Sequence, residues 1–489
     1  MAKQSPDILP AGIFLQKNTA VPLYMQVYQQ FRDMIASRRL RPGERLPPSR
    51  ELAKTLGVSR VIISQGFEQL MMEGYIIGKT GSGTFVADVL PDSMLNATPV
   101  KTPIRKKHTT YQPVNSAGVQ PFQIGTPSLD QFPYKLWQQT GSRVLKDLKA
   151  STLGYEDTLG YMPLRKAIAG YLRVSRAVQC EPEQVVVVSG SQQGFNLVSR
   201  CLLQPGDRVW MEDPCYAGVS KLLLQHKVQL CAIPVEADGM NVSYALQHYP
   251  EAKLAYVTPS QQFPLGGALS QQKRELLLQW AQQHNSWILE DDYDSEFRYE
   301  GNPLPSLQGM DTAGRVIYSG TFSKVLFPGL RLAYLVLPDA AITAQFKQVK
   351  FYTDRQSPIL EQLITTRFME EGHFLRHIRK MRLLYAERHA HMRAFAATYI
   401  SAYCTICPSA SGMHLLCRLN NNIDSTVLKA AIKQAQLRIY FIEENILEQH
   451  LQPAMLLGFT AFSRYQMKTG FEQLATCLQK AVFDLPAKS

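Results

Sequence analysis

Cysteine and long hydrophobic runs are both scarce in this chain. Its 489 residues include eight cysteines, and so small a number in so long a chain excludes a disulfide-rich scaffold. Cys404 and Cys407 form the only CxxC pair, no second pair lies at the spacing of a zinc site, and we expect buried thiols and no metal. No stretch reaches the ~18 apolar residues of a membrane span, and residues 1–16 lack the apolar run of a signal peptide. We expect a soluble, cytoplasmic protein that has no membrane partner.

Charged residues are also few, at 19% of the chain, while hydrophobic residues make up 45%. This balance excludes an intrinsically disordered protein and provides enough side chains for buried cores. At about 150 residues per domain, the chain is too long for one small domain. The net charge of +12 is unevenly distributed, because residues 1–120 contain 15 basic and 8 acidic residues. A basic N-terminal quarter indicates a polyanionic partner such as nucleic acid.

The pattern of residues 21–88 predicts three helices followed by a β-hairpin. Apolar residues recur at helical period over 23–38. Ser49 and Ser59 are suited to cap a helix over 50–56 and another over about 60–73, with a short turn at Gly57 between them. Two β-prone runs, 75–77 and 84–86, flank a glycine-rich tip. We therefore expect an α+β winged helix-turn-helix domain at 21–88.

The rest of the chain divides into a linker and a large domain. Residues 89–118 contain four prolines and show no periodicity, which predicts an exposed, flexible linker. Over 119–489, strand and helix patterns alternate, which favours a mainly parallel sheet covered on both faces.

A lysine framed by small hydroxyl residues occurs in residues 319–324 (SGTFSK), directly after an apolar run. Hydroxyl groups at a strand end can hold a phosphate, and a desolvated Lys324 can form a Schiff base with an aldehyde. A lysine on an ordinary Ser/Gly turn is the alternative interpretation. Residues 290–293 (EDDY) close another apolar strand. An acid there can neutralise a pyridinium nitrogen, and a tyrosine can hydrogen-bond a phenolic ring oxygen.

These motifs resemble the lysine loop and ring-binding strand of fold-type I aminotransferases, and the resemblance covers about residues 120–483. Residues 46–53 (LPPSRELA), 57–60 (GVSR) and 81–86 (GSGTFV) resemble the GntR winged helix-turn-helix. Both domains in one chain are the layout of the MocR group of bacterial regulators. The resemblance implies a multidomain protein with an α/β fold-type I domain, a smaller α+β C-terminal subdomain and pyridoxal 5′-phosphate (PLP) as cofactor.

The resemblance also implies roles in cofactor binding. Lys324 would hold PLP as an internal aldimine, and Tyr293 would meet the ring oxygen. Asp291 would meet the pyridine nitrogen, with Glu290 and Asp292 as alternatives. The other implied residues are Gly190, Ser191 and Gln192 in a phosphate cradle at a helix start, Thr321, Ser323 and Arg331 around the phosphate, Tyr216 stacked on the ring, and Gln262 at the ring oxygen, where aminotransferases use Asn.

Two further residues are implied outside that set. Tyr155 would reach the cofactor phosphate of a neighbouring subunit, which implies a domain-swapped homodimer. A surface or core tyrosine is the alternative. Arg464 would bind the α-carboxylate of an effector, because its planar fork suits a carboxylate. A structural salt bridge is the alternative there.

In the N-terminal domain the resemblance implies DNA contacts. Residues 61–63 (VII) are apolar where family members often have Thr or Asn, so one of them can touch a thymine methyl group. Ordinary solvated helix charges are the alternative for the arginines. The implied contacts are Arg50, Ser59 and Arg60 at the two helices, Gly81 and Gly83 in the wing, and Arg45 and Lys79 at phosphates.

These features predict a PLP-dependent DNA-binding transcriptional regulator that binds operator DNA as a dimer. It would sense PLP, or a small amine or amino-acid effector, through Lys324. The alternative is a PLP-dependent aminotransferase with an autoregulatory DNA-binding head, and residual aminotransferase activity fits either reading. A third possibility is a large domain that only dimerises and binds no cofactor.

Overall fold

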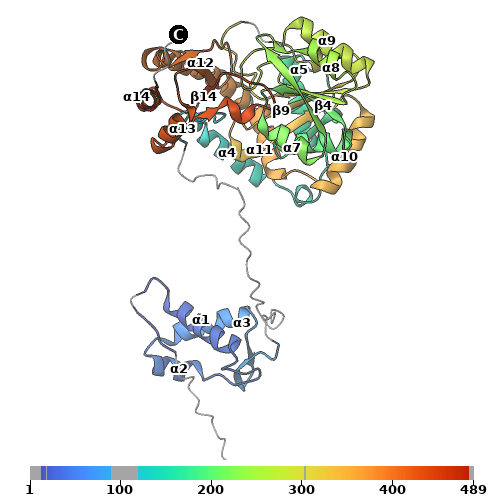
Figure 1. The fold of residues 1–489 in the computed structure, drawn as a ribbon. Coiled ribbons are helices and arrows are strands. Elements are labelled where there is room, and N and C mark those ends of the chain that lie inside the picture. Colours follow the sequence, from blue (N-terminus) through green and yellow to red (C-terminus); the bar gives the residue numbers. More distant parts are fainter. Residues whose placement is uncertain (1–12, 18, 90–118, 302–303, 484–489) are drawn as a thin grey trace, which may run out of the picture. The chain divides into compact units, whose positions relative to one another are not determined.

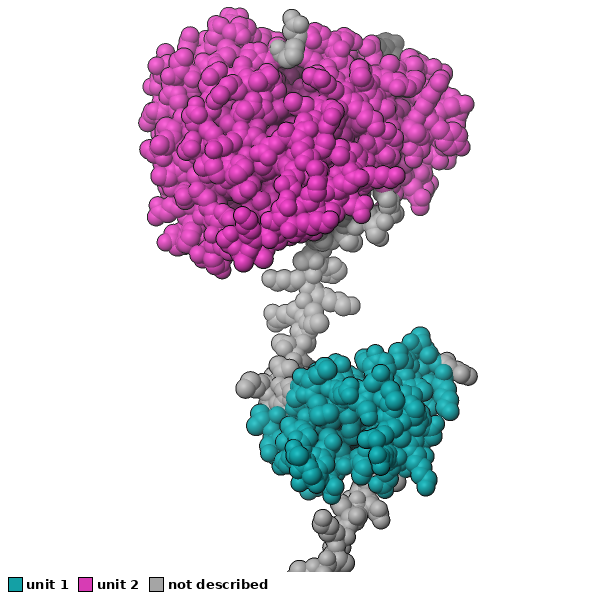
Figure 2. Space-filling model, turned by 180° about the vertical axis from the view of Figure 1, so that it is seen from behind, with its two compact units in different colours: residues 1–113 teal, residues 114–489 magenta. Residues whose placement is uncertain are grey.

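The computed structural model describes residues 13–17, 19–89, 119–301 and 304–483 (Figure 1). The chain divides into two compact units, residues 1–113 and 114–489 (Figure 2). Apart from Val89, the linker predicted at 89–118 lies outside the described residues. No helix within the described ranges is long and apolar enough to cross a bilayer.

The N-terminal unit contains three helices followed by a two-stranded hairpin. The helices are α1 (Leu23–Ala36), α2 (Ser49–Leu56) and α3 (Arg60–Met72), and the strands are β1 (Ile76–Lys79) and β2 (Gly83–Val86). The strands are antiparallel, which confirms the predicted winged helix-turn-helix.

Helix starts and close packing explain this local fold. Ser59 is the N-cap of α3, as predicted, whereas α2 begins one residue earlier than expected, at Ser49. Helices α1 and α3 cross at Gly66, where an added Cβ would lie 2.9 Å from Cγ1 of Val27. A glycine is needed there because any larger side chain would push the helices apart.

An eight-stranded sheet forms the centre of the second unit. Its strand order is β3-β10-β9-β8-β7-β4-β5-β6, and β9, β8, β7, β4 and β5 are parallel to their neighbours in that run. The antiparallel strands are β10 and the short edge strand β6. The bounds are β3 (Val185–Val188), β4 (Arg208–Asp213), β5 (Gln229–Glu236), β6 (Gly239–Met240), β7 (Leu254–Val257), β8 (Trp287–Asp292), β9 (Val316–Thr321) and β10 (Ala333–Val336).

Helices cover both faces of this sheet, as the alternating pattern predicted (Figure 1). Alternate strand residues pack into separate cores, because successive side chains point to opposite faces. Helices α6 (Ser191–Leu202), α7 (Ala217–Gln225) and α10 (Ala340–Thr353) contribute to the core on one face. The opposite face packs against α5 (Met162–Arg176), α8 (Val242–His248), α9 (Gln271–Gln283) and α11 (Ile359–Glu370), and α4 (Tyr134–Lys146) packs against α11.

A smaller α+β subdomain follows, with its own antiparallel four-stranded sheet in the order β11-β12-β14-β13. The strands are β11 (Cys404–Ile406), β12 (His414–Leu419), β13 (Tyr440–Phe441) and β14 (Ala454–Gly458). The helices are α12 (His373–Tyr399), α13 (Ser425–Gln434) and α14 (Arg464–Lys480), and their apolar faces form one core with the sheet. This arrangement confirms the predicted fold class.

Candidate functional site

A cavity of about 390 Å³ lies at the carboxyl ends of β8 and β9 and at the start of α6, and we call it the central cavity. In sheets with parallel strands, loops at this edge carry the ligand-binding residues. The residues implied by sequence that line it are Gly190, Ser191, Gln192, Tyr216, Asp291, Tyr293, Thr321, Ser323, Lys324 and Arg331.

Lys324 lies in the loop that follows β9, and its Nζ donates a hydrogen bond to the carbonyl oxygen of Gly125 (2.9 Å). Burial lowers the pKa of Lys324, while Asp294 and Asp291 act in the opposite direction. A lowered pKa increases the fraction of neutral amine, which is the form that attacks a carbonyl carbon. The position therefore gives Lys324 the properties of an amine nucleophile.

The three adjacent acids at the end of β8 have different surroundings. Glu290 accepts hydrogen bonds from two backbone N–H groups in the 307–308 turn (2.9 and 3.0 Å). Asp292 forms a buried ion pair with Arg176 (2.7 Å). Asp291 lies on the opposite face of the strand and lines the central cavity. The alternation of side chains along β8 thus leaves Asp291 as the acid of the three that faces a ligand.

The surroundings of the Asp291 carboxyl group suit the binding of a cation. Burial raises its pKa to about 7, although a hydrogen bond from the hydroxyl of Tyr256 (2.7 Å) acts to lower it. A positive charge placed beside this carboxyl group would restore its ionised form. A protonated pyridine nitrogen is a cation of that kind.

Gly190 and Arg331 form an anion cradle at the start of α6. Gly190 is the N-cap of α6 and has a φ of 127°. A Cβ added at Gly190 would lie 2.9 Å from Nη2 of Arg331, so the guanidinium group lies directly against the glycine backbone. The first N–H groups of a helix and an arginine fork together bind phosphate well. Thr321 and Ser323 line the same cavity.

Two tyrosines also line the central cavity. The buried hydroxyl of Tyr293 has no hydrogen-bond partner among the described residues. A buried hydroxyl without a partner is costly, so its placement suits a ligand that supplies an acceptor. Tyr216 is 43% exposed and packs edge-on against Phe263, with 6.0 Å between ring centroids.

Gln262 is not among the residues that line the central cavity, and its implied role at the ring oxygen stays a prediction. Its side chain is buried, and its Nε2 donates to the carbonyl oxygen of Pro214 (2.8 Å). Its Oε1 accepts from the N–H of Leu265 (3.0 Å). The amide is thus engaged by its surroundings and serves to shape the 258–266 loop.

Arg464 is also not among the residues that line the central cavity, and its implied role as a carboxylate ligand stays a prediction. It is exposed and is the first residue of α14. Ser463 and Gln466 form a capping box that fixes the helix start at this position. The cap therefore places the arginine on the surface.

Tyr155 is 77% exposed and is absent from the lining of its own chain's cavity. The guanidinium carbon of Arg355 lies 3.8 Å from the centre of its ring. This contact holds a tyrosine at the surface, where a second subunit can reach it. Its role in a neighbouring site stays a prediction.

Sequence patterns did not reveal several residues of the cavity wall. Asp294 directly follows the recognised EDDY motif, so that motif was the signal that could have led to it. Phe195, Phe263 and Pro328 lie within a few residues of predicted site residues. The others come from distant segments that no local pattern links: Ile124, Gly125, Tyr256, Met413, His414 and Tyr440.

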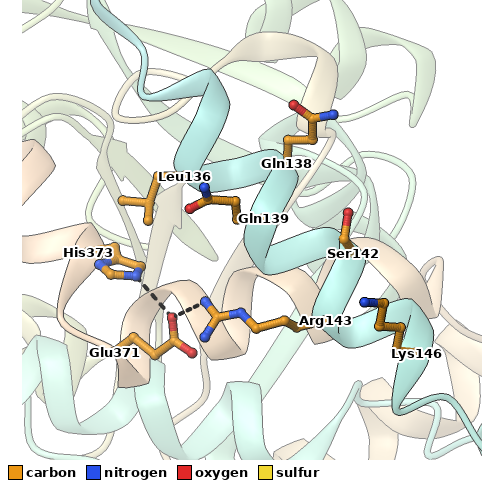
Figure 3. Close-up of a pocket in the computed structure, with 8 residues that line it drawn as sticks. All are labelled: Leu136, Gln138, Gln139, Ser142, Arg143, Lys146, Glu371 and His373. Atoms are coloured by element: carbon orange, nitrogen blue, oxygen red, sulfur yellow. Dashed lines mark hydrogen bonds and ion pairs between the residues drawn. The ribbon is translucent and has the colours of Figure 1, made fainter.

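A larger hollow of about 840 Å³ lies between α4 and the junction of α11 with α12 (Figure 3). Its acidic side chain, Glu371, is already paired with Arg143 (2.7 Å) and with His373 (2.9 Å). The hollow is open to the surface, and none of the residues implied by sequence lines it. Volume alone therefore does not identify the functional site.

The residues implied in DNA binding are all exposed in the N-terminal unit. At the first turn of α3, Nε of Arg60 donates to Oγ of Ser49 (3.3 Å), which links the two helices of the motif. Val61, in the same turn, is 63% exposed, whereas Ile63 is fully buried. Val61 is therefore the apolar residue of the 61–63 run that is free to touch a base.

Two further basic residues, Arg45 and Lys79, lie beside and on the wing, respectively. Arg45 lies against Gly83, where an added Cβ would be 3.1 Å from Nε of Arg45. Nζ of Lys79 lies 5.1 Å from the centre of the Phe85 ring. Exposed cations on or beside a hairpin suit contacts with phosphate.

Comparison with known proteins agrees with the fold of both units of the chain. Residues 23–86 match the family described as bacterial regulatory proteins of the gntR family, and residues 122–467 match aminotransferase class I and II. A probable rhizopine catabolism regulatory protein, MocR, of Rhizobium meliloti is 35% identical over 94% of this chain and 95% of that protein. The chain belongs to the MocR group of GntR-family transcriptional regulators.

Other MocR-type relatives and solved aminotransferases support this assignment. The pyridoxine biosynthesis regulator PdxR of Corynebacterium glutamicum is 32% identical over 78% of this chain and 80% of its own length. The structure of kynurenine aminotransferase from Pyrococcus horikoshii, solved with PMP, has a TM-score of 0.69 and is 25% identical. It covers 79% of this chain and 99% of its own. A chain of the MocR group thus combines a DNA-binding domain with a domain that has the fold of PLP-dependent aminotransferases.

Proposed function

We propose that this chain is a PLP-dependent transcriptional regulator that binds operator DNA through residues 21–88 and binds its signal in the central cavity. The signal is PLP itself, or a small amine or amino acid that reaches bound PLP. One observation carries the proposal: Lys324, Asp291 and Tyr293 converge beside an anion cradle in a chain that also contains a GntR domain. PdxR, which is named for pyridoxine biosynthesis, is a relative that fits such a signal.

The residues of the central cavity fit PLP. Asp291 would hold the protonated ring nitrogen, and the unpartnered hydroxyl of Tyr293 would donate to the phenolic oxygen. The cradle of Gly190 and Arg331, with Thr321 and Ser323 beside it, would hold the phosphate. When bound, the cofactor supplies an aldehyde that reacts with primary amines and an absorption band that reports its state.

The N-terminal unit supports operator binding in physical terms. The first turn of α3 carries Ser59, Arg60 and Val61 on the surface, which suits a helix N-terminus entering the major groove. Arg45 and Lys79 would fix the register through phosphate contacts. A homodimer would present two such heads to two half-sites, and Tyr155 would complete the cavity of the other subunit.

The experiment that tests the proposal uses the full-length protein. Genomic fragments that the PLP-treated protein retains are sequenced, and one fragment is then used for mobility-shift titrations with and without PLP. We expect the affinity or the migration of the complex to depend on PLP for the wild type and not for Lys324→Ala. Lys221→Ala, which removes an exposed lysine of α7, is the control and should behave as the wild type. Equal behaviour of wild type and K324A would contradict the proposal.

The alternative of an aminotransferase with an autoregulatory head rests on the same cavity, because the nucleophile and both ring contacts are present. Steady turnover of an amino acid with a 2-oxo acid, at about the 10 s⁻¹ typical of enzymes, would favour it. Tight binding of one genomic fragment with negligible turnover would favour the regulator.

A further inference from the structure

Asp294 is a buried acid in the wall of the central cavity that the proposed cofactor contacts do not use. It lies one residue after Tyr293 and lines the cavity together with Lys324. Its relative exposure is 2%, and its Oδ2 has no hydrogen-bond partner among the described residues. A buried carboxyl oxygen without a partner is costly, so a ligand that supplies a donor would relieve the cost.

The neighbouring acids each have at least one partner, although Oδ1 of Asp292, which does not line the cavity, is also buried without one among the described residues. Asp291 accepts from Tyr256, Asp292 is paired with Arg176, and Oε1 of Glu296 accepts from a tyrosine hydroxyl (2.9 Å). Burial raises the pKa of Asp294 well above its ordinary value, and Asp292, Glu296 and Asp291 raise it further. Lys324 is the cation that opposes this effect. If the proposed cofactor occupies Lys324, the neighbourhood of Asp294 is left short of positive charge.

The basic groups of the cavity are otherwise committed. Among the described residues that line it, they are Lys324, Arg331 and His414. Arg331 lies against Gly190 in the anion cradle. Nε2 of His414 lies 3.1 Å from the carbonyl oxygen of Pro264, and burial lowers its pKa, so it is neutral at physiological pH.

Among the described residues of one chain that line the cavity, this leaves no free cation for a carboxylate on the ligand. A carboxylate placed in the cavity would find no free guanidinium or ammonium group among the described lining residues, and a buried charge without a partner is costly. A second ammonium group, in contrast, would find the open oxygen of Asp294.

We propose that the effector of the central cavity is a small diamine, with one amine directed to the cofactor site at Lys324 and the other bound by Asp294. This inference rests on the proposed function, because it assigns the ligand class of the same site. It predicts discrimination against amino acids of similar length, whose carboxylate would occupy the place of the second ammonium group.

The test uses the PLP-loaded, full-length protein and follows the absorption band of the bound cofactor during titration. The probes are 1,4-diaminobutane, n-butylamine and 4-aminobutanoate, which share a four-carbon chain and differ at the far end. We expect the diamine to act at a concentration at least about tenfold lower than the other two, as the loss of a buried charge partner predicts. Equal response to diamine and monoamine, or a stronger response to the aminobutanoate, would overturn the inference.

Asp294→Asn provides the matched variant, because it keeps the shape and removes the charge. In D294N we expect the preference for the diamine to fall to within about twofold of that for butylamine, while the response to butylamine is retained. Glu183→Gln removes an exposed carboxylate and should keep the wild-type preference. A D294N protein that keeps the full diamine preference would also overturn the inference.

The outcomes separate this inference from the proposed function. If PLP gives no absorption band with the wild-type protein, the cofactor proposal fails. If the band forms and responds to butylamine, but the diamine acts at no lower concentration than butylamine, only the role of Asp294 fails. The wild-type comparison needs no variant, so poor folding of D294N would not leave the question open.

Discussion

Nζ of Lys324 donates a hydrogen bond to the carbonyl oxygen of Gly125, 2.9 Å away and 199 residues earlier in the chain. Gly125 has a φ of 68°, and a Cβ added there would lie 2.5 Å from Nζ. The hydrogen bond directs the Lys324 amine across the cavity, and the absence of a side chain at Gly125 leaves room for that amine. Both effects depend on a glycine at this position.

We expect Gly125→Ala to weaken PLP binding about tenfold or more, because the methyl group would displace the Lys324 amine and strain the backbone. The measurement is a PLP titration followed by absorption. Gly170→Ala, on an open face of α5 where an added Cβ meets nothing within 4 Å, should bind PLP as the wild type does. Normal PLP binding by G125A would show that the Lys324 amine can move away from residue 125 without loss of PLP binding.

The stability of the cofactor-free protein should depend on pH through Asp291. Its folded-state pKa is raised to about 7, so between about pH 4 and 7 the folded state binds more protons than the unfolded state. The free energy of unfolding therefore falls as pH rises through this window, by about 1 kcal/mol per pH unit for one such group. Glu212 and Glu290, whose pKa values burial also raises to about 7, act in the same direction.

Asp291→Asn removes one of the carboxyl groups that bind a proton in the folded state over this pH range. Denaturant unfolding at pH 5, 6 and 7 should therefore show a shallower decline for D291N than for the wild type. PLP should reduce the decline in the wild type alone, since a ring cation stabilises the ionised carboxylate. Identical slopes in the two proteins would mean that Asp291 is already ionised in the folded state.

Tyr155 allows a test of shared sites by subunit mixing. K324A and Y155F should each bind PLP poorly on their own. In a mixed dimer, the Y155F subunit supplies Lys324 while the K324A subunit supplies Tyr155 to the same cavity. Refolding an equal mixture should then restore about a quarter of the tight sites expected for a two-fold dimer with random pairing. No recovery would place Tyr155 outside the neighbouring site and return it to a surface role beside Arg355.

Arg60→Ala tests the DNA surface. Loss of a base or phosphate contact should cost about 1–3 kcal/mol in operator affinity, with a relaxed sequence preference if a base is read. Loss of a phosphate contact alone should instead lower the salt slope by about 1 without changing the preference. Salt-dependent binding of matched and mismatched fragments distinguishes the two, with Lys221→Ala as the equal-charge control. Unchanged affinity would support the reading of Arg60 as a solvated helix charge that is held by Ser49.

The sequence predicted those parts of the site that lie within short, local patterns. Asp291 lies at the end of β8, where strand alternation determines the face to which its side chain points, and Tyr293 and Lys324 follow the ends of β8 and β9 within three residues. Gly190 begins a helix after a strand, which likewise fixes its backbone geometry. Such residues need only their immediate neighbours to be placed.

The residues that lie outside the cavity wall, and those that the sequence did not point to, depend on contacts that no local pattern contains. Arg464 has suitable chemistry, but the Ser463 cap decides where its helix starts and turns it outward. Gln262 has a suitable amide, but Pro214, 48 residues away, occupies it. Gly125 and His414 enter the cavity only through the packing of distant segments, and neither stands in a recognisable motif.

The walls of the central cavity come from two separately packed sheets. Asp291 and Lys324 belong to the eight-stranded sheet and its loops, whereas Met413 and His414 belong to the four-stranded one. A molecule bound in the cavity therefore contacts both packed regions at once. A compound that fits one relative placement of these regions better than another would favour that placement.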